Sequence, residues 1–115
     1  MGVISQTHII YILYLNHGKV YIQFISKSNM PLDKRPLKTV IGKLVVTKEG
    51  KRLGIVKDIT FETKTGELIQ VVMKDSTPYT RNLNLEMSPN KDILVPYNTI
   101  IAIGDFVVIS EEDLA

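Results

Sequence analysis

A strand-turn-strand segment in the middle of the chain constrains the fold most. Residues 52–62 are rich in Ile, Val, Thr and Phe, and residues 67–74 form a second β-prone run. Gly66 lies in the turn between them, where a positive φ angle is expected. Residues 43–47 form a further run, joined to residue 52 by a tight turn at residues 48–51. The sequence therefore predicts three antiparallel strands in a meander.

The alternation of side chains predicts which faces of these strands are buried. In the third strand, Ile69, Val71 and Met73 are expected on one face, with Leu68 and Val72 on the other, so both faces are expected to be at least partly covered. In the second strand, Val56 has the opposite parity to Ile59 and Phe61. A β-bulge near Lys57 and Asp58 would turn these three side chains to one side, and it would bend the strand as small barrels require.

Short β-prone runs continue to the end of the chain, at residues 82–87, 92–97, 99–103 and 106–110. Within the second of these runs, Pro96 implies an edge or bulged position, because proline has no N–H to donate to a ladder. The Gly-Asp pair between the last two runs is a good hairpin signal. No window shows a 3.6-residue apolar period long enough for a helix, so the sequence predicts an all-β domain.

Size, charge and residue usage exclude several classes of protein. A chain of 115 residues has room for one domain. A net charge of +2 is too small to mark a nucleic-acid-binding protein. The absence of Cys excludes disulfides and thiolate metal ligands. The longest apolar run, residues 9–15, has seven residues, whereas a membrane-spanning helix needs about 20.

The sequence suggests an N-terminal extension at residues 1–36, a domain at residues 37–110 and an acidic tail at residues 111–115. Two interpretations of the first 29 residues remain open. In one, residues 9–15 and 19–25 form a hairpin around an Asn-His-Gly turn. In the other, which we favour, Met30 is the true start and the preceding segment is not native.

The residues that usually support catalysis are scarce. The two histidines, His8 and His17, both precede residue 30, so a Ser-His-Asp arrangement is not available to the expected domain. Asp58, Glu62 and Asp75 are interpreted as turn and solvent-facing charges rather than as an acid-base pair. We expect no enzymatic activity, no catalytic residues, no cofactor and no metal site.

One cluster of basic residues occurs in the turn before the second strand. Lys48, Lys51 and Arg52 lie there with the acidic Glu49 among them and no aromatic residue nearby in the sequence. Single-stranded nucleic acid is typically bound by aromatic side chains beside a positively charged groove. The cluster is therefore interpreted as a solvated turn, and nucleic acid is not favoured as a partner.

The last predicted hairpin carries more apolar side chains than a small barrel can bury. Both faces of its two strands are apolar, so one face is expected to contact another chain, unless loops and the N-terminal segment cover it. Phe106 and Val108 share one parity in the final strand and are the strongest candidates. The candidate interface also includes Ile101 and Ile103.

Several of these segments together resemble the PRC-barrel family, in its short, stand-alone archaeal form. The resemblance covers residues 37–109 and rests on the following segments: Gly42-Lys43-Leu44-Val45-Val46, Gly50, residues 53–59, Thr65-Gly66, residues 68–73, residues 93–97 and residues 101–109. The segments Val95-Pro96-Tyr97 and Ala102-Ile103-Gly104-Asp105 narrow the assignment most.

The resemblance implies a small, strongly bent antiparallel barrel of about six to seven strands. It also implies a non-enzymatic interaction module, because the short archaeal members resemble cell-division proteins that form dimers and link the membrane anchor of the division ring to other components. We therefore expect a homodimeric, cytoplasmic adaptor that is recruited to the division site through its partners, without direct membrane insertion. The alternative is an adaptor for RNA processing or ribosome maturation, related to the barrel of the ribosome-maturation factor.

Overall fold

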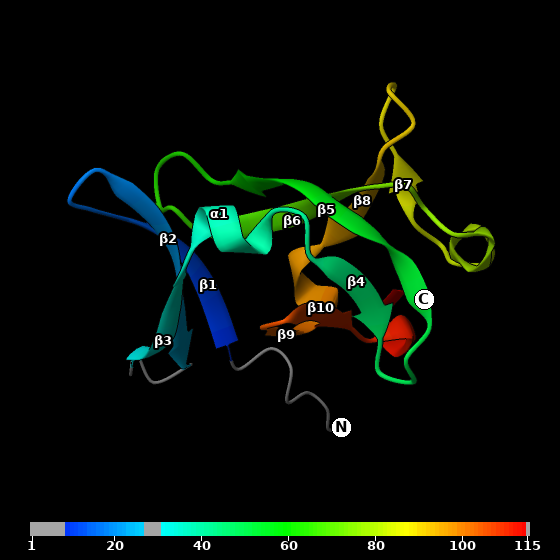
Figure 1. The fold of residues 1–115 in the computed structure, drawn as a ribbon, viewed down its shortest axis with the longest axis horizontal. Helices are drawn as coiled ribbons and strands as arrows, with labels where there is room; N and C mark the ends of the chain where they lie inside the picture. The colour runs from blue at the N-terminus through cyan, green and yellow to red at the C-terminus, as the bar shows by residue number, and fades with distance from the viewer. Residues whose placement is uncertain (1–8, 27–30, 115) are drawn as a thin grey trace.

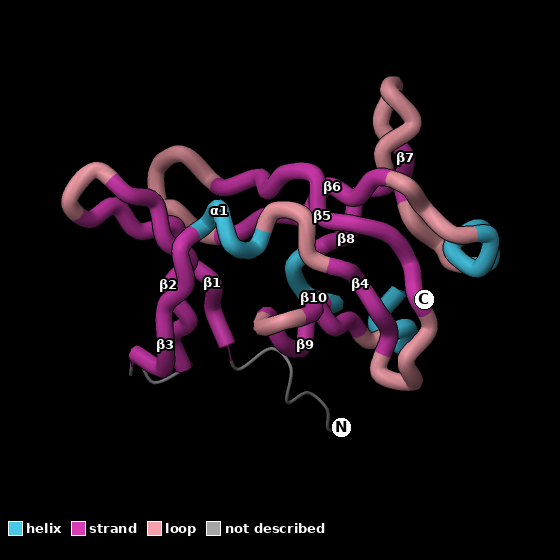
Figure 2. Tube along the Cα trace, viewed as in Figure 1, coloured by secondary structure: helices cyan, strands magenta, loops and turns pink. Residues whose placement is uncertain are grey.

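The computed structural model describes residues 9–26 and 31–114, which form two β-sheets (Figure 1). The N-terminal strands form a sheet of three, and the later strands form a sheet of seven. Strands dominate and the helical segments are short (Figure 2), which confirms the all-β class. His8 and Met30 lie outside the described residues, so the expected start at Met30 stays a prediction.

The N-terminal segment contains the hairpin that one of its two interpretations predicts. β1 (Ile9–Asn16) and β2 (Lys19–Ser26) are antiparallel, with full pairing along both strands. The connecting residues His17 and Gly18 have φ angles of 51° and 76°, as a two-residue hairpin turn often requires. β3 (Pro31–Pro36), which the sequence did not predict, pairs with the other side of β2.

The predicted meander is present in the seven-stranded sheet. β4 (Leu44–Thr47), β5 (Arg52–Phe61) and β6 (Leu68–Lys74) are consecutive neighbours, and each is antiparallel to the next. Gly66, in the turn between β5 and β6, has a φ angle of 77°, as expected. The complete order of the sheet is β7-β8-β6-β5-β4-β10-β9.

The bulge predicted in β5 is confirmed. The register between β5 and β6 shifts between Val56 and Asp58, which leaves Lys57 as the extra residue. The side chains of Val56 and Ile59 are buried on the inner side, and Phe61 packs against the core. The bulge therefore joins two stretches of opposite parity into one buried face.

A second shift in the same pair of strands corrects the prediction for β6. The register moves past Ile69 between Leu68 and Gln70, so Ile69 is the extra residue on this strand. Its side chain is 42% exposed, whereas those of Val71 and Met73 are fully buried. The prediction that these three side chains share one face is therefore wrong, because the bulge turns the side chain of Ile69 to the opposite side.

The strand expected at residues 82–87 is much shorter in the structure. A 3₁₀ segment (Pro78–Asn82) precedes it, and β7 consists of Glu86–Met87 alone. The N–H groups of Leu83 and Leu85 donate to nearby carbonyls of the same segment, so local turns replace the ladder there. β8 (Ile93–Pro96) then pairs with both β7 and β6. Its last residue, Pro96, lies beyond the end of β7 and faces one strand only, as expected.

The C-terminal hairpin closes the sheet in a way that the sequence did not indicate. β9 (Ile100–Ile103) and β10 (Phe106–Ile109) form the expected antiparallel hairpin around Gly104 and Asp105. β10 also pairs with β4, and this pair is parallel, so the sheet is not purely antiparallel. Figure 1 shows the hairpin beneath β4, at one side of the strongly curved sheet. The short helix α1 (Leu37–Val40) connects the two sheets.

The buried core includes side chains from both sheets. Tyr11 of β1 and Ile22 of β2 belong to the same buried cluster as the inner residues of the seven-stranded sheet. A backbone bridge between Ile12 and Glu67 joins β1 to the start of β6. The N-terminal hairpin therefore packs on the curved sheet instead of standing apart from it.

The side chain of Tyr11 makes this packing testable by pH. Burial raises the pKa of the Tyr11 hydroxyl to about 12, and this hydroxyl has no hydrogen-bond partner among residues 9–26 and 31–114. Above pH 10 the tyrosine ionises in the unfolded chain but stays protonated in the folded chain, so the stability present below pH 10 is lost as the pH rises towards 12. The expected slope is about 1.4 kcal/mol per pH unit.

The variant Tyr11→Phe should remove this slope and should stabilise the protein at neutral pH by roughly 1 kcal/mol, because an unpaired buried hydroxyl is lost. Urea unfolding of both proteins between pH 8 and pH 11 would measure the difference, with the other tyrosines unchanged. Identical pH profiles for the two proteins would show that Tyr11 is not buried.

Candidate interaction surface

The four residues expected at an interface do not share one face of the last hairpin. Phe106 is 50% exposed, and Val108 and Ile101 are half-buried. Ile103 is 5% exposed and belongs to the core, so its place in the candidate interface is corrected. The reason is that Ile103 pairs directly with Val107, which is itself buried, and directly paired residues point to the same side of a sheet.

Phe106 and Val108 belong to a larger apolar surface on the outer side of the sheet. Phe106 pairs with Leu44, Leu44 pairs with Ile55, and Val108 pairs with Val46. Phe106 is exposed and the other four side chains are half-buried. Because paired residues face the same side, these five residues form one surface across β10, β4 and β5, which we name the outer patch.

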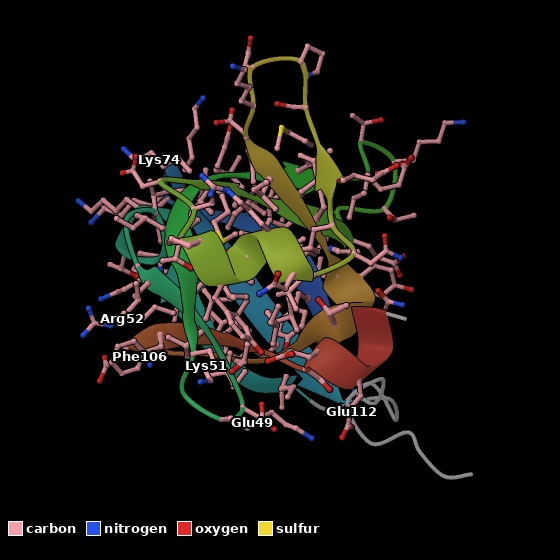
Figure 3. The ribbon with its side chains drawn as sticks, turned by 90° about the vertical axis from the view of Figure 1, so that its right-hand side faces the viewer. Glu49, Lys51, Arg52, Lys74, Phe106 and Glu112 are labelled. Atoms are coloured by element: carbon pink, nitrogen blue, oxygen red, sulfur yellow. The ribbon has the colours of Figure 1, made fainter. Side chains whose placement is uncertain are left out.

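Basic side chains flank the outer patch. Arg52 pairs with Val46, and Lys74 pairs with Ile55; both basic residues are exposed. Figure 3 shows Arg52, Lys74 and Phe106 projecting away from the sheet on the same side. The outer patch therefore combines an apolar centre with a cationic margin.

The basic side chains of the turn, Lys48, Lys51 and Arg52, are all exposed, as expected of a solvated turn, and the fold adds the ring of Tyr79 beside them. The Lys51 ammonium lies 5.5 Å from the centre of the Tyr79 ring, and Phe106 and Arg52 project to the same side of the sheet (Figure 3). The Tyr79 hydroxyl donates a hydrogen bond of 2.7 Å to Glu111 Oε2, and this bond is the main reason why the pKa of Tyr79 is raised. The sequence could not predict that Tyr79 lies near Lys51, because the two residues are far apart in the chain.

β9 forms one edge of the seven-stranded sheet, because β10 is its only partner among the described strands. Ala102 in this strand is exposed. Ile101 is the extra residue of a bulge in the pairing of β9 with β10. An edge strand offers backbone N–H and C=O groups to which another chain can add a strand. The outer patch and this edge adjoin each other, since Ala102 pairs with Val108.

Two of the three carboxylates considered for acid-base chemistry, Asp58 and Glu62, have local structural roles, and the third, Asp75, is exposed. Asp58 Oδ1 accepts a hydrogen bond of 2.8 Å from the N–H of Ile59, and Glu62 Oε1 accepts one of 2.6 Å from the N–H of Lys64. Among residues 9–26 and 31–114, no group of three or more His, Cys, Asp or Glu residues is placed to hold a metal ion. No helix in the same ranges is long and apolar enough to cross a membrane.

A small, curved β-sheet domain with an exposed apolar face and an open edge strand is suited to interaction and assembly. The chain belongs to the PRC-barrel family, because the model of the PRC-barrel domain matches residues 33–114. It is also 31% identical over 85 residues to an uncharacterized protein, MJ1118, from Methanocaldococcus jannaschii. This similarity covers 72% of the chain and 89% of that protein.

Proposed function

We propose that this protein is a non-enzymatic assembly module, and specifically a homodimeric PRC-barrel adaptor that acts in archaeal cell division. The observation that carries the proposal is the outer patch, in which an apolar sheet face is left open around the half-exposed ring of Phe106. Contiguous apolar patches on small proteins mark interaction sites. A second copy of the chain would bury this ring together with its apolar neighbours.

The non-enzymatic part of the proposal is supported by the residues that remain for chemistry. The domain at residues 37–110 contains neither His nor Cys, so it lacks the usual general bases and thiol nucleophiles. Asp58 and Glu62 are engaged with neighbouring backbone N–H groups. This scarcity of catalytic groups supports a function that rests on the apolar surfaces.

The assignment to cell division rests on the resemblance to short archaeal PRC-barrel proteins. The similarity to a protein of Methanocaldococcus jannaschii over 89% of that protein's length supports the short, stand-alone type. In this proposal the protein is cytoplasmic, and its contacts with other division components recruit it to the division site.

The variant Phe106→Asp tests the dimer. We expect the wild type to be dimeric and the variant to associate at least tenfold more weakly, because a carboxylate would be buried in an apolar interface. Light scattering after size-exclusion chromatography measures the mass, and circular dichroism verifies the fold. The matched control is Met87→Asp, since Met87 is 60% exposed on the opposite edge strand. A monomeric wild type, or a folded Phe106→Asp dimer, would contradict the proposal.

The margin of the outer patch supports a second candidate function, an adaptor for RNA processing or ribosome maturation. Arg52 and Lys74 lie on the margin of the outer patch that contains Phe106, and Lys51 lies over the ring of Tyr79, so basic and aromatic groups occur on the same part of the sheet. Binding of RNA that weakens steeply with salt and is lost in the double variant Arg52→Gln/Lys74→Gln would favour this candidate. Capture from native cells would separate the two, since division proteins support the first and ribosomal particles the second.

A further inference from the structure

A groove of about 590 Å³ lies where the N-terminal hairpin meets the seven-stranded sheet. It is separate from the outer patch, because it lies at the start of β6, whereas Lys74 on the margin of the outer patch ends the same strand. The two ends of β6 are about 20 Å apart, at roughly 3.3 Å per residue. The groove is lined by Glu62, Glu67, Glu86, Ile69 and Tyr97, among others. We name it the acidic groove.

The topology explains why a groove forms at this place. β1 joins β6 through the bridge between Ile12 and Glu67, and β8 joins it through the pair of Gln70 and Pro96. β5 occupies the other side of β6, so β1 and β8 approach the same edge from its two ends. Between them, the bulge at Ile69 interrupts the regular ladder. Bulges of this kind redirect side chains and are frequent at functional sites.

The charged side chains that line the acidic groove are all negative. Glu62 and Glu67 flank the turn between β5 and β6, and Glu86 lies in β7. Among the residues that the structure describes, no Lys or Arg lines the groove, although the whole chain carries a net charge of +2. Two large apolar side chains in the lining are exposed: Ile69 at 42% and Tyr97 at 54%. A complementary ligand therefore needs positive charges and apolar groups close together.

We propose that the acidic groove binds an extended, positively charged segment of a partner protein. Lys or Arg side chains of the segment would reach the three glutamates, and the apolar side chains between them would cover Ile69 and Tyr97. An extended segment fits because its side chains alternate between two sides at short intervals. The same negative charge disfavours RNA and anionic lipid surfaces, both of which would be repelled.

The test uses a fluorescein-labelled peptide of four Arg-Val repeats, with a peptide of four Glu-Val repeats for comparison. Fluorescence anisotropy should show binding of the cationic peptide only, and the binding should weaken as salt is added. The triple variant Glu62→Gln/Glu67→Gln/Glu86→Gln should bind roughly tenfold more weakly, because three exposed charge pairs are lost. The substitution Ile69→Ser should weaken binding without changing its salt dependence.

The matched control removes three exposed acidic residues elsewhere: Glu49→Gln, Asp105→Asn and Glu112→Gln. This control should bind the peptide within twofold of the wild type. An equal loss in both triple variants would show general charge attraction and would overturn the proposal. Circular dichroism verifies folding, and amide chemical shifts of the wild type on peptide addition should change around Ile69 and Tyr97.

The acidic groove and the proposed dimer can fail independently. Phe106→Asp should bind the cationic peptide as well as the wild type does, even where it no longer dimerises. If the triple glutamine variant instead loses self-association and no peptide binds to the wild type, the groove receives the basic margin of a second copy, and the proposed partner segment is wrong.

Discussion

Replacing Ile22 by alanine is expected to lower the free energy of unfolding by roughly 2–5 kcal/mol. Ile22 lies in the middle of β2, is 0% exposed, and packs in the same cluster as the inner side chains of the seven-stranded sheet. Truncation removes buried methyl groups and leaves a cavity that the paired strands cannot close completely. Urea unfolding followed by circular dichroism would give the difference from the wild type.

The control for this variant is Leu15→Ala, in the neighbouring strand of the same hairpin. Leu15 is 70% exposed, so its truncation should change stability by less than about 0.5 kcal/mol. If Ile22→Ala unfolds at the same urea concentration as the wild type, the hairpin does not pack on the curved sheet. That outcome would show that the domain at residues 37–110 is stable without the packing of the hairpin.

Replacing Gly54 by alanine is expected to destabilise the protein by roughly 1–3 kcal/mol, through overpacking. A Cβ atom at this position would lie 2.6 Å from Cγ of Met73 and 2.7 Å from the carbonyl oxygen of Lys74. The methionine side chain can move, but the carbonyl belongs to the paired strand β6 and cannot move without disturbing the ladder. The expected result is a lower urea midpoint with an unchanged slope.

Gly104→Ala is the control, because the nearest atom to its added Cβ would be an Arg35 nitrogen at an ordinary 3.7 Å. Its unfolding midpoint should remain close to that of the wild type. The double variant Gly54→Ala/Met73→Ala identifies the source of the strain. If Met73→Ala removed the extra cost of Gly54→Ala, the side chain and not the backbone would be the obstacle, and the argument from β6 would be wrong.

Local sequence patterns were sufficient to predict most strands of the domain. Turn residues such as Gly66 and the Gly104-Asp105 pair marked where strands end, since their preferred backbone angles depend on short stretches of sequence. The bulge at Lys57 was also predictable, because the inner residues on its two sides have opposite parity. The family resemblance was confirmed by the match at residues 33–114.

Errors arose where two strands pair irregularly. Ile69 and Ile103 both fit a simple alternation, yet Ile69 is exposed and Ile103 is buried. The bulge at Ile69 depends on how β5 and β6 align, and the inward direction of Ile103 follows from its pairing with Val107. The register between two strands cannot be deduced from the alternation of side chains within either strand. Alternation alone therefore could not predict which way Ile69 and Ile103 point.

The sequence by itself determined the strand-forming segments, the positions of the main turns, the scarcity of catalytic residues and the excess of apolar side chains in the last hairpin. The tertiary structure decided which of those side chains remain exposed. It placed β10 beside β4 and so assembled the outer patch, and it brought β1 and β8 to the same edge of β6, where the acidic groove forms. The physical reason is that turn and strand preferences act over a few residues, whereas a surface is defined by the pairing of strands that are distant in the chain.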